Sequence, residues 1–382
     1  MCPDARTRRL VHLRAGTDRK MTSERKQPKP EADASGDMPD ELSPRHIVRR
    51  LVELALLGAV VAVAISALPG LGTLRHRFAQ ADVAFIVLAG LLKLCSCLSN
   101  ILAFRDVFCP RLGWGFSYRL GMAEQATNVL LPTGGAGGLA LGAWALRRGG
   151  MSTEYIARRS VAFFVITSAP NFLCAAVIGP LLAFHILPGH APSVPTVVFT
   201  VLAIGSMVFA VLLPLVVEHI RPRHPRSRPA RALNAALVSL ADGIRDTGAL
   251  LSPRHIRVIL GAIGYLAFDI GAFAAAFAAF GSTPPFGALV FGYVIGQLGG
   301  LIPVPGGIGG TDGGLIGAMV LYGAPLSQTA AAVVAYRTFQ LGIPAILGAI
   351  AFVQLRRTIG RSDEPTKLCA PLAEPVRGEA MP

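Results

Sequence analysis

The residues of this chain with the most chemical potential are a few charged side chains that lie inside long apolar runs. Two are cations, Lys93 and Arg337, and three carry carboxylates, Glu124, Asp269 and Asp312. A charge in hydrocarbon is costly, so such residues inside a membrane usually belong to a binding site or a transport path. We therefore predict that these five side chains contact a substrate.

Polar neighbours extend this set. Asn128 follows Glu124 by four residues, and Gln340 lies on the same helical face as Arg337. We expect Arg337 to be the main anion contact, helped by Lys93. Asp312 opens a short helix, where a carboxylate caps free backbone donors. The alternative is internal pairing that only stabilises the bundle, and it stays open for Lys93 and Asp269.

Other kinds of chemistry find no support in the sequence. The eight histidines form no His-x-x-x-His pair, and neither a P-loop nor a Gly-x-Ser-x-Gly elbow is present. Gly135-x-Gly137-x-x-Ala140 resembles a dinucleotide fingerprint but follows no strand. We therefore expect no catalytic residue, no metal and no cofactor. The net charge of +14 does not indicate nucleic acid, because Lys and Arg also gather in the cytoplasmic loops of membrane proteins.

Composition places the charged residues in a membrane. Hydrophobic residues make up 52% of the 382 positions and charged residues 15%, whereas soluble domains carry about 25% charged residues. A bilayer-spanning helix needs about 20 apolar residues. Six uninterrupted runs satisfy this, at 51–68, 81–104, 160–187, 194–217, 256–280 and 326–355.

Two further apolar stretches, 117–146 and 286–322, are interrupted by proline and clustered glycine. Proline lacks a backbone donor and glycine disfavours a helix by about 1 kcal/mol, so each stretch should be two short helices joined by a loop. The expected loop residues are Pro132, Gly134, Gly135 and Gly137 in the first, and Pro303, Pro305, Gly306, Gly307 and Gly309 in the second. Such backbone is tolerated at membrane depth where it lines a cavity.

The arginine clusters predict the topology. They flank the first broken stretch on both sides, whereas the flanks of the second broken stretch carry no charge. Because Arg accumulates on the cytoplasmic side, the first stretch should enter from the cytoplasm and the second from the exterior, with both chain termini cytoplasmic. The two halves then form an inverted repeat, and paired Gly/Pro-broken segments in such repeats point to a substrate site.

The predicted fold is therefore an all-α integral membrane protein with about six full spans and two re-entrant hairpins. The membrane domain covers 46–357, with halves at 46–190 and 191–357 and a cytoplasmic amphipathic linker at 219–255. Residues 1–45 and 358–382 are polar or charged, contain proline, and are expected to be disordered cytoplasmic tails.

Two motifs resemble those of a known family. Pro303-Val304-Pro305-Gly306-Gly307-Ile308-Gly309 is followed by Asp312 and Ala335-Tyr336-Arg337, and Asn128-Val129-Leu130-Leu131-Pro132 by Arg147-Arg148-Gly149-Gly150-Met151-Ser152. They resemble the transmembrane-domain family of lysylphosphatidylglycerol synthases over roughly 51–357. The family usually has Glu at the position of Asp312, and a polar or acidic residue near Gly138.

The resemblance implies lipid handling in the bacterial cytoplasmic membrane. We expect a flippase-like translocator of a lipid with an anionic or zwitterionic head group, whose partners are membrane lipids. The alternative is an enzyme or accessory subunit that makes polyprenyl-phosphate-linked glycolipids, with Glu124 or Asp312 as base. Synthases that transfer lysine carry a large soluble domain after the membrane part. Only about 25 residues follow Arg357, so we do not expect lysyl transfer by this chain alone.

Overall fold

The computed structural model describes residues 72–131, 136–148, 151–189, 192–220, 228–301 and 307–359, together with Arg49 and Val52. Nearly all of these residues are helical, and none lies in a strand. The helices are α2 (Gly72–Ala79), α3 (Val83–Phe108), α4 (Trp114–Leu130), α5 (Ala136–Arg148), α6 (Thr153–Ala183), α7 (Ser193–Ile220), α8 (Arg228–Leu250), η3 (Pro253–His255), α9 (Ile256–Ala278), α10 (Phe286–Gln297), η4 (Leu298–Leu301), α11 (Gly310–Leu321) and α12 (Leu326–Ile359).

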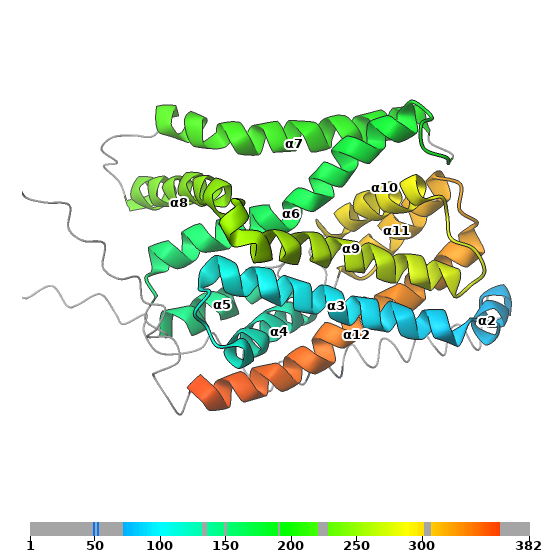
Figure 1. The fold of residues 1–382 in the computed structure, drawn as a ribbon, viewed down its shortest axis with the longest axis horizontal. Helices are drawn as coiled ribbons and strands as arrows, with labels where there is room; N and C mark the ends of the chain where they lie inside the picture. Colours follow the sequence, from blue (N-terminus) through cyan, green and yellow to red (C-terminus); the bar gives the residue numbers. More distant parts are fainter. Residues whose placement is uncertain are drawn as a thin grey trace, which may run out of the picture. The chain divides into compact units, whose positions relative to one another are not determined.

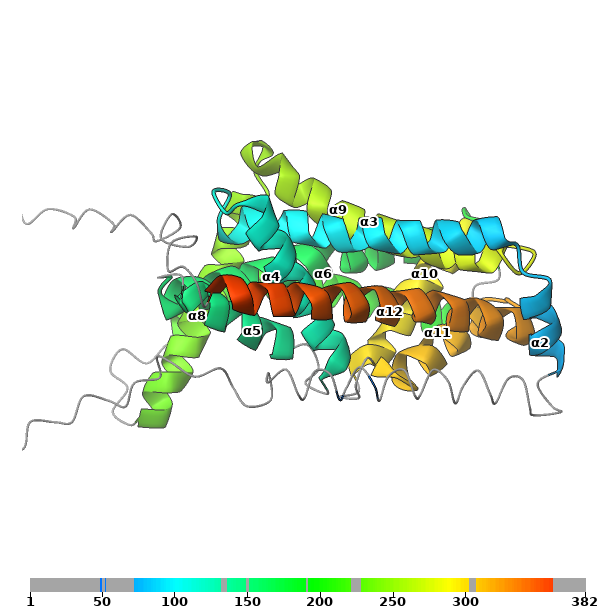
Figure 2. The same ribbon diagram turned by 90° about the horizontal axis from the view of Figure 1, so that it is seen from below.

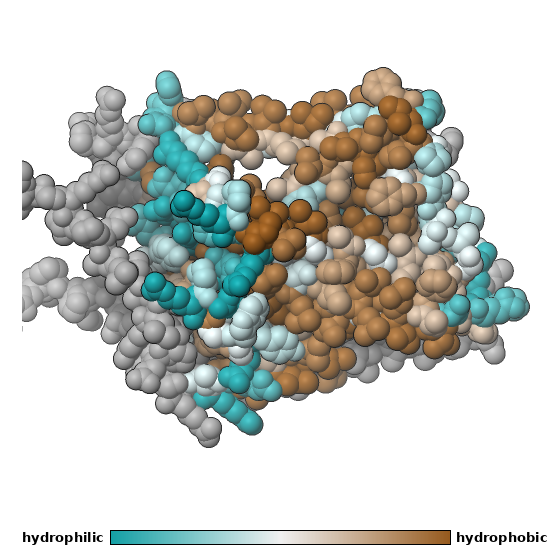
Figure 3. Space-filling model, viewed as in Figure 1, coloured by the Kyte–Doolittle hydropathy of each residue, from teal (hydrophilic) through white to brown (hydrophobic). Residues whose placement is uncertain are grey.

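Five of the described helices, α3, α6, α7, α9 (with the preceding η3) and α12, are long and apolar enough to cross a membrane. They correspond to five of the six predicted spans; of the sixth, at 51–68, only Val52 is among the described residues. Apolar side chains cover the middle of the face in Figure 3, with hydrophilic residues towards its two ends. The prediction of an all-helical membrane protein is confirmed for the described part of the chain.

Local sequence signals explain where two of these helices begin. The Asp82 carboxylate accepts a hydrogen bond from the Ala84 N–H at 2.9 Å and so caps α3. The Ser152 hydroxyl accepts one from the Tyr155 N–H at 3.2 Å and caps α6. Each bond satisfies one of the donors that a helix leaves free in its first turn.

Helices α3, α9 and α12 run side by side in both views (Figures 1 and 2). Helix α9 approaches α3 closely at Gly261, where an added Cβ would lie 2.8 Å from the Ser99 carbonyl oxygen. Helix α12 approaches α4 in the same way at Gly348, which faces the Met122 carbonyl. Small residues at such crossings let membrane helices pack backbone against backbone.

Each predicted broken segment consists of two short helices. In the first, α4 ends at Leu130 and α5 begins at Ala136; in the second, α10 continues through η4 before α11 begins at Gly310. The pair α4 and α5 lies towards the same end of the bundle as α8, and α10 and α11 lie towards the other end (Figure 1). The inverted repeat itself stays a prediction. One short element, α2, was not predicted.

Candidate functional site

Lys93 and Asp269 form an ion pair in the interior of the bundle. The Lys93 ammonium on α3 lies 2.6 Å from one carboxylate oxygen of Asp269 on α9, and both side chains are almost fully buried. Removing two charges from water is unfavourable unless they pair closely and their remaining hydrogen-bonding atoms are satisfied. The internal pairing considered for these two residues therefore matches the observed geometry.

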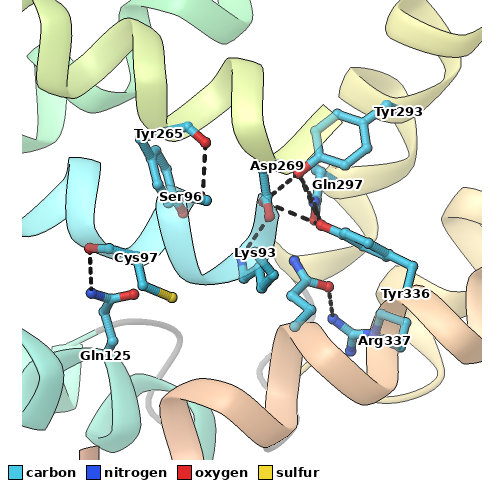
Figure 4. Close-up of polar contacts among 11 residues, drawn as sticks. Lys93, Ser96, Cys97, Gln125, Tyr265, Asp269, Tyr293, Gln297, Tyr336 and Arg337 are labelled. Carbon is cyan, nitrogen blue, oxygen red and sulfur yellow. Dashed lines mark hydrogen bonds and ion pairs between the residues drawn. The ribbon is translucent and has the colours of Figure 1, made fainter. Parts of the chain in front are cut away.

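Two tyrosines complete the surroundings of Asp269 (Figure 4). Its second carboxylate oxygen accepts hydrogen bonds from Tyr293 of α10 at 2.7 Å and Tyr336 of α12 at 3.2 Å. Each phenol has one hydrogen, so the Gln297 amide, 2.7 Å from the Tyr293 oxygen, acts as the donor there. A single buried carboxylate thus joins four helices, α3, α9, α10 and α12. We call these five side chains the Asp269 network.

A second ion pair lies where α11 begins. The Arg337 Nε donates to one carboxylate oxygen of Asp312 at 2.7 Å, and its Nη1 donates to the Gln340 amide oxygen at 2.7 Å. The other oxygen of Asp312 accepts from the Gly309 N–H at 2.8 Å, which is the capping role expected for this carboxylate. Arg337 is buried, whereas the Asp312 side chain is 30% exposed.

The backbone at the second break requires glycine. Gly307 and Gly309 have positive φ values of 63° and 84°, a region that residues with a Cβ rarely adopt. Gly299 of η4 lies so close to the Gly310 carbonyl that a Cβ would collide with it. This contact brings the end of η4 against the start of α11.

The first hairpin carries a different set of polar contacts. The Asn128 side-chain oxygen, near the end of α4, accepts a hydrogen bond from the Gly138 N–H of α5 at 2.8 Å. The Glu124 carboxylate, one turn earlier, packs directly over Gly142 of α5. Within the described part of the chain, no hydrogen bond or ion pair holds Glu124.

The structure thus divides the predicted contacts into three groups. Lys93 and Asp269 lie together, as do Asp312, Arg337 and Gln340, and Tyr336 and Arg337 are adjacent on α12, so these two groups are neighbours (Figure 4). Asn128 and Glu124 lie separately on α4. Of the loop glycines, Gly137 lies in α5, and Gly307 and Gly309 directly precede α11. The other predicted loop residues lie outside the described residues: Pro132, Gly134, Gly135, Pro303, Pro305 and Gly306.

Sequence reasoning missed Tyr293, Tyr336 and Gln297 as parts of a polar network. Tyrosine inside an apolar run is also an ordinary core residue, and nothing in the spacing relates these three to Asp269. An intramembrane carboxylate does, however, require hydrogen-bond donors. A search for hydrogen-bond donors in the other apolar stretches would have found these two tyrosines and the glutamine.

Among the residues that the structure describes, no three His, Cys, Asp or Glu side chains are grouped as a metal site requires. The two ion pairs described above instead place the buried cations Lys93 and Arg337 near the second hairpin. Such an arrangement suits recognition of an anionic group, because Arg donates in a planar fork and a helix N-terminus attracts negative charge.

Comparison with known proteins identifies the family. Residues 51–348 match the family model described as the lysylphosphatidylglycerol synthase TM region. No curated protein and no solved structure matches the chain. The matched region includes both hairpins and the Asp269 network. The chain therefore belongs to the lysylphosphatidylglycerol synthase transmembrane family, which indicates a lipid-related function in the membrane.

Proposed function

We propose that this protein translocates a lipid with a phosphate-bearing head group across the cytoplasmic membrane. The observation that carries the proposal is the buried Arg337 guanidinium beside the start of α11. A buried arginine in a membrane is costly and is retained where it serves binding. Its planar donors match the oxygens of a phosphate, and the adjacent helix N-terminus favours the same charge.

The ion pair with Asp312 suggests how binding can be reversible. Asp312 holds Arg337 through one oxygen and the Gly309 N–H through the other. A lipid phosphate is also an anion, so it can replace Asp312 as the partner of the guanidinium while Asp312 keeps the backbone contact. Exchange of one anion for another avoids leaving a bare buried cation at any stage. A carrier needs this property, since a substrate held too tightly is not released.

The Asp269 network has a supporting part in this proposal. Lys93 is neutralised by Asp269, and Asp269 also binds Tyr336, the residue before Arg337. We therefore assign Lys93 and Asp269 the role of positioning α12, and thereby Arg337, against the second hairpin. Glu124 and Asn128 lie in the first hairpin, where a lipid leaving the second would be received.

A lipid that passes from the second hairpin to the first crosses the membrane only if the two hairpins open to opposite membrane faces. In support, the two hairpins lie towards opposite ends of the bundle (Figure 1), and α12 packs against α4 of one and α11 of the other. Single cysteines at Ser152 and Ser282, both exposed, test the arrangement with an impermeant thiol reagent. Ser282→Cys should react from outside and Ser152→Cys only after permeabilisation. Reaction of both from the same side would exclude the inverted repeat.

Translocation itself is tested in proteoliposomes that contain the purified chain and fluorescent phosphatidylglycerol. The readout is the fraction of probe that a membrane-impermeant quencher reaches with time. Arg337→Gln should slow translocation at least about tenfold, as expected for loss of a charge-assisted contact, and Arg337→Lys should retain part of the rate. Arg119→Gln is a matched control, because Arg119 is partly buried near the far end of α12, where it binds Thr358. Equal rates for a folded Arg337→Gln variant and the wild type would refute the proposal.

One observation favours a second function. Glu124 has no ionic or hydrogen-bonding partner within the described residues, and an available carboxylate is what a general base requires. The activity would be sugar transfer from a polyprenyl-phosphate donor, and purified chain with a labelled donor measures it directly. Turnover that Glu124→Gln abolishes and Arg337→Gln leaves intact would favour this enzyme over the translocator.

A further inference from the structure

Helices α6, α7 and α8 enclose a triangular opening, one corner of which also contacts Phe291 of α10 in the second hairpin. Near one end, Thr200 of α7 packs onto Gly179 of α6. Near the other end, Arg245 of α8 donates to Glu218 of α7 at 2.7 Å. Figure 1 shows α7 along the top with α6 slanting away from it, and Figure 3 shows open space beneath α7.

The third corner joins α6 to α8. An added Cβ at Gly243 of α8 would lie 2.6 Å from Val161 of α6, so the two backbones are close there. Between their corners, α6 and α7 each run for about 27 Å at ~1.5 Å per residue. This length is close to the ~30 Å of a hydrocarbon core. The opening therefore has the depth of an acyl-chain layer.

The helices that bound the opening are apolar. Between the corners, their large exposed side chains include Phe164, Leu173 and Val177 on α6 and Val208, Leu212 and Leu215 on α7. Water beside such a surface at membrane depth is unfavourable. Hydrocarbon fills such a space at no such cost, so an acyl chain suits this opening better than water does.

The corner between α6 and α8 carries charge. The Arg158 Nη2 donates to both oxygens of Asp246, at 2.9 and 3.2 Å, and Glu154 lies one turn before Arg158 on α6. Arg159 is differently placed. Its Nε lies 4.0 Å from Asp246, beyond hydrogen-bond distance, and is buried with no hydrogen-bond partner, while its guanidinium lies 5.3 Å from the centre of the Tyr155 ring.

The remaining charges near this corner are already matched. Arg245 contacts both Glu218 and Asp242, with an Nη1 to carboxylate distance of 3.6 Å for Asp242. Asp246 is taken by Arg158. The Nε of Arg158 also has no partner, but its Nη2 binds Asp246, whereas Arg159 makes no hydrogen bond among the described residues. Arg159 is therefore the cation of this corner least satisfied by protein, and it lies at the end of the apolar opening.

We propose that this opening binds an anionic phospholipid, with an acyl chain between α6 and α7 and the phosphate on Arg159. Arginine at the end of a membrane helix can place its charged head at the interface while its stem stays in the apolar layer. The Arg159 side chain is 23% exposed, and a phosphate oxygen accepts from its outer guanidinium nitrogens rather than from the buried Nε. The site lies apart from Arg337, so it does not depend on the translocation proposed above.

The experiment uses the full chain in nanodiscs with two photoreactive lipids that carry the same diazirine-labelled acyl chain. One has a phosphatidylglycerol head group and the other a phosphatidylcholine head group. Mass spectrometry of digested protein then measures labelling of residues 161–179 and 200–218. We expect phosphatidylglycerol to label these segments about tenfold more than phosphatidylcholine, as one charge-assisted contact predicts. Labelling of Val83–Phe108 should show no such preference.

Arg159→Gln should abolish the preference for phosphatidylglycerol, and Arg159→Lys should keep most of it. Arg254→Gln is the matched control, since Arg254 is exposed and outside the triangle. Equal labelling by the two lipids in the wild-type chain would overturn the proposal, as would a folded Arg159→Gln variant that keeps the preference. If Arg159→Gln fails to fold, the wild-type comparison and Arg159→Lys still decide the question.

Discussion

The two hairpins hold their breaks together by different means. In the second hairpin, a charged side chain on the arm after the break, Asp312, accepts the Gly309 N–H and binds Arg337. In the first, a neutral side chain on the arm before the break, Asn128, accepts the Gly138 N–H. In both hairpins a side-chain oxygen thus accepts a backbone N–H, and the means differ in charge: Asp312 is neutralised by Arg337, whereas Glu124 has no ionic partner within the described residues.

The two hairpins therefore differ in their charged contacts although each consists of two short helices joined at a break. The second hairpin is also tied to the Asp269 network through Tyr293, whereas α4 packs on α3 through apolar side chains and a long hydrogen bond from Gln125 to the Cys97 carbonyl at 3.4 Å. A buried ion pair is stabilising only while both charged partners are present, because loss of one leaves the other buried and unpaired. We therefore expect substitutions around the second hairpin to have the larger effects.

The largest effect should come from Lys93→Met. It leaves Asp269 charged, buried and without its cation, which costs about 3–5 kcal/mol when one member of a buried pair is removed. Thermal or chemical unfolding of the purified chain measures the loss. The double variant Lys93→Met with Asp269→Asn should recover much of it, because the remaining amide still accepts from the tyrosines. No recovery would mean that Lys93 acts through packing rather than charge.

Asp312→Asn should have the next largest effect. The amide keeps a hydrogen-bond acceptor but not the charge that binds Arg337, so a loss of about 1.5–3 kcal/mol is expected. Hydrogen exchange should also become faster at 307–312, close to the break. Unchanged exchange there would show that the Asp312 contacts do not hold the second hairpin.

Asn128→Ala removes one neutral hydrogen bond across the first break. The expected cost is about 1 kcal/mol, with faster exchange confined to the start of α5. Asn128→Asp is the sharper companion, because it places a carboxylate where the second hairpin has one but supplies no arginine. If the Asp variant is more stable than wild type, the first hairpin has a cationic partner for it and the contrast is wrong.

The smallest effect should come from Glu124→Gln. Since no ion pair or hydrogen bond holds this side chain within the described residues, neutralising it removes no partner, and the loss of unfolding free energy should be smaller than the roughly 1 kcal/mol expected for one neutral hydrogen bond. The same unfolding assay measures it. A loss as large as that of Asp312→Asn would reveal a partner for Glu124 and remove the asymmetry between the hairpins.

Much of the fold was predictable because membrane helices are recognised by composition. The run at 194–217 predicted α7, and Pro132 and Pro303 with their glycines predicted both breaks. The eight-residue helix α2 was missed because it has no apolar stripe and includes His76 and Arg77. The charged site residues were found because a charge in an apolar run is conspicuous.

The partners of those charges were not predictable. Lys93 and Asp269 are 176 residues apart, and nothing in the sequence favours this ion pair over one between Lys93 and Asp312. Only the close packing of α3 on α9 decides it. For the same reason the tyrosines that complete the Asp269 network became visible only once α10 and α12 were placed beside α9.

The contact of α12 with both hairpins has a thermodynamic consequence. Arg337, which binds the second hairpin, and Gly348, which packs on α4 of the first, lie on one continuous helix about 16 Å apart along its axis at ~1.5 Å per residue. If a ligand at Arg337 changes the position of α12, it changes the free energy with which α4 packs on α12 at Gly348. Linkage is reciprocal, so occupancy of the first hairpin must alter affinity at the second by the same factor.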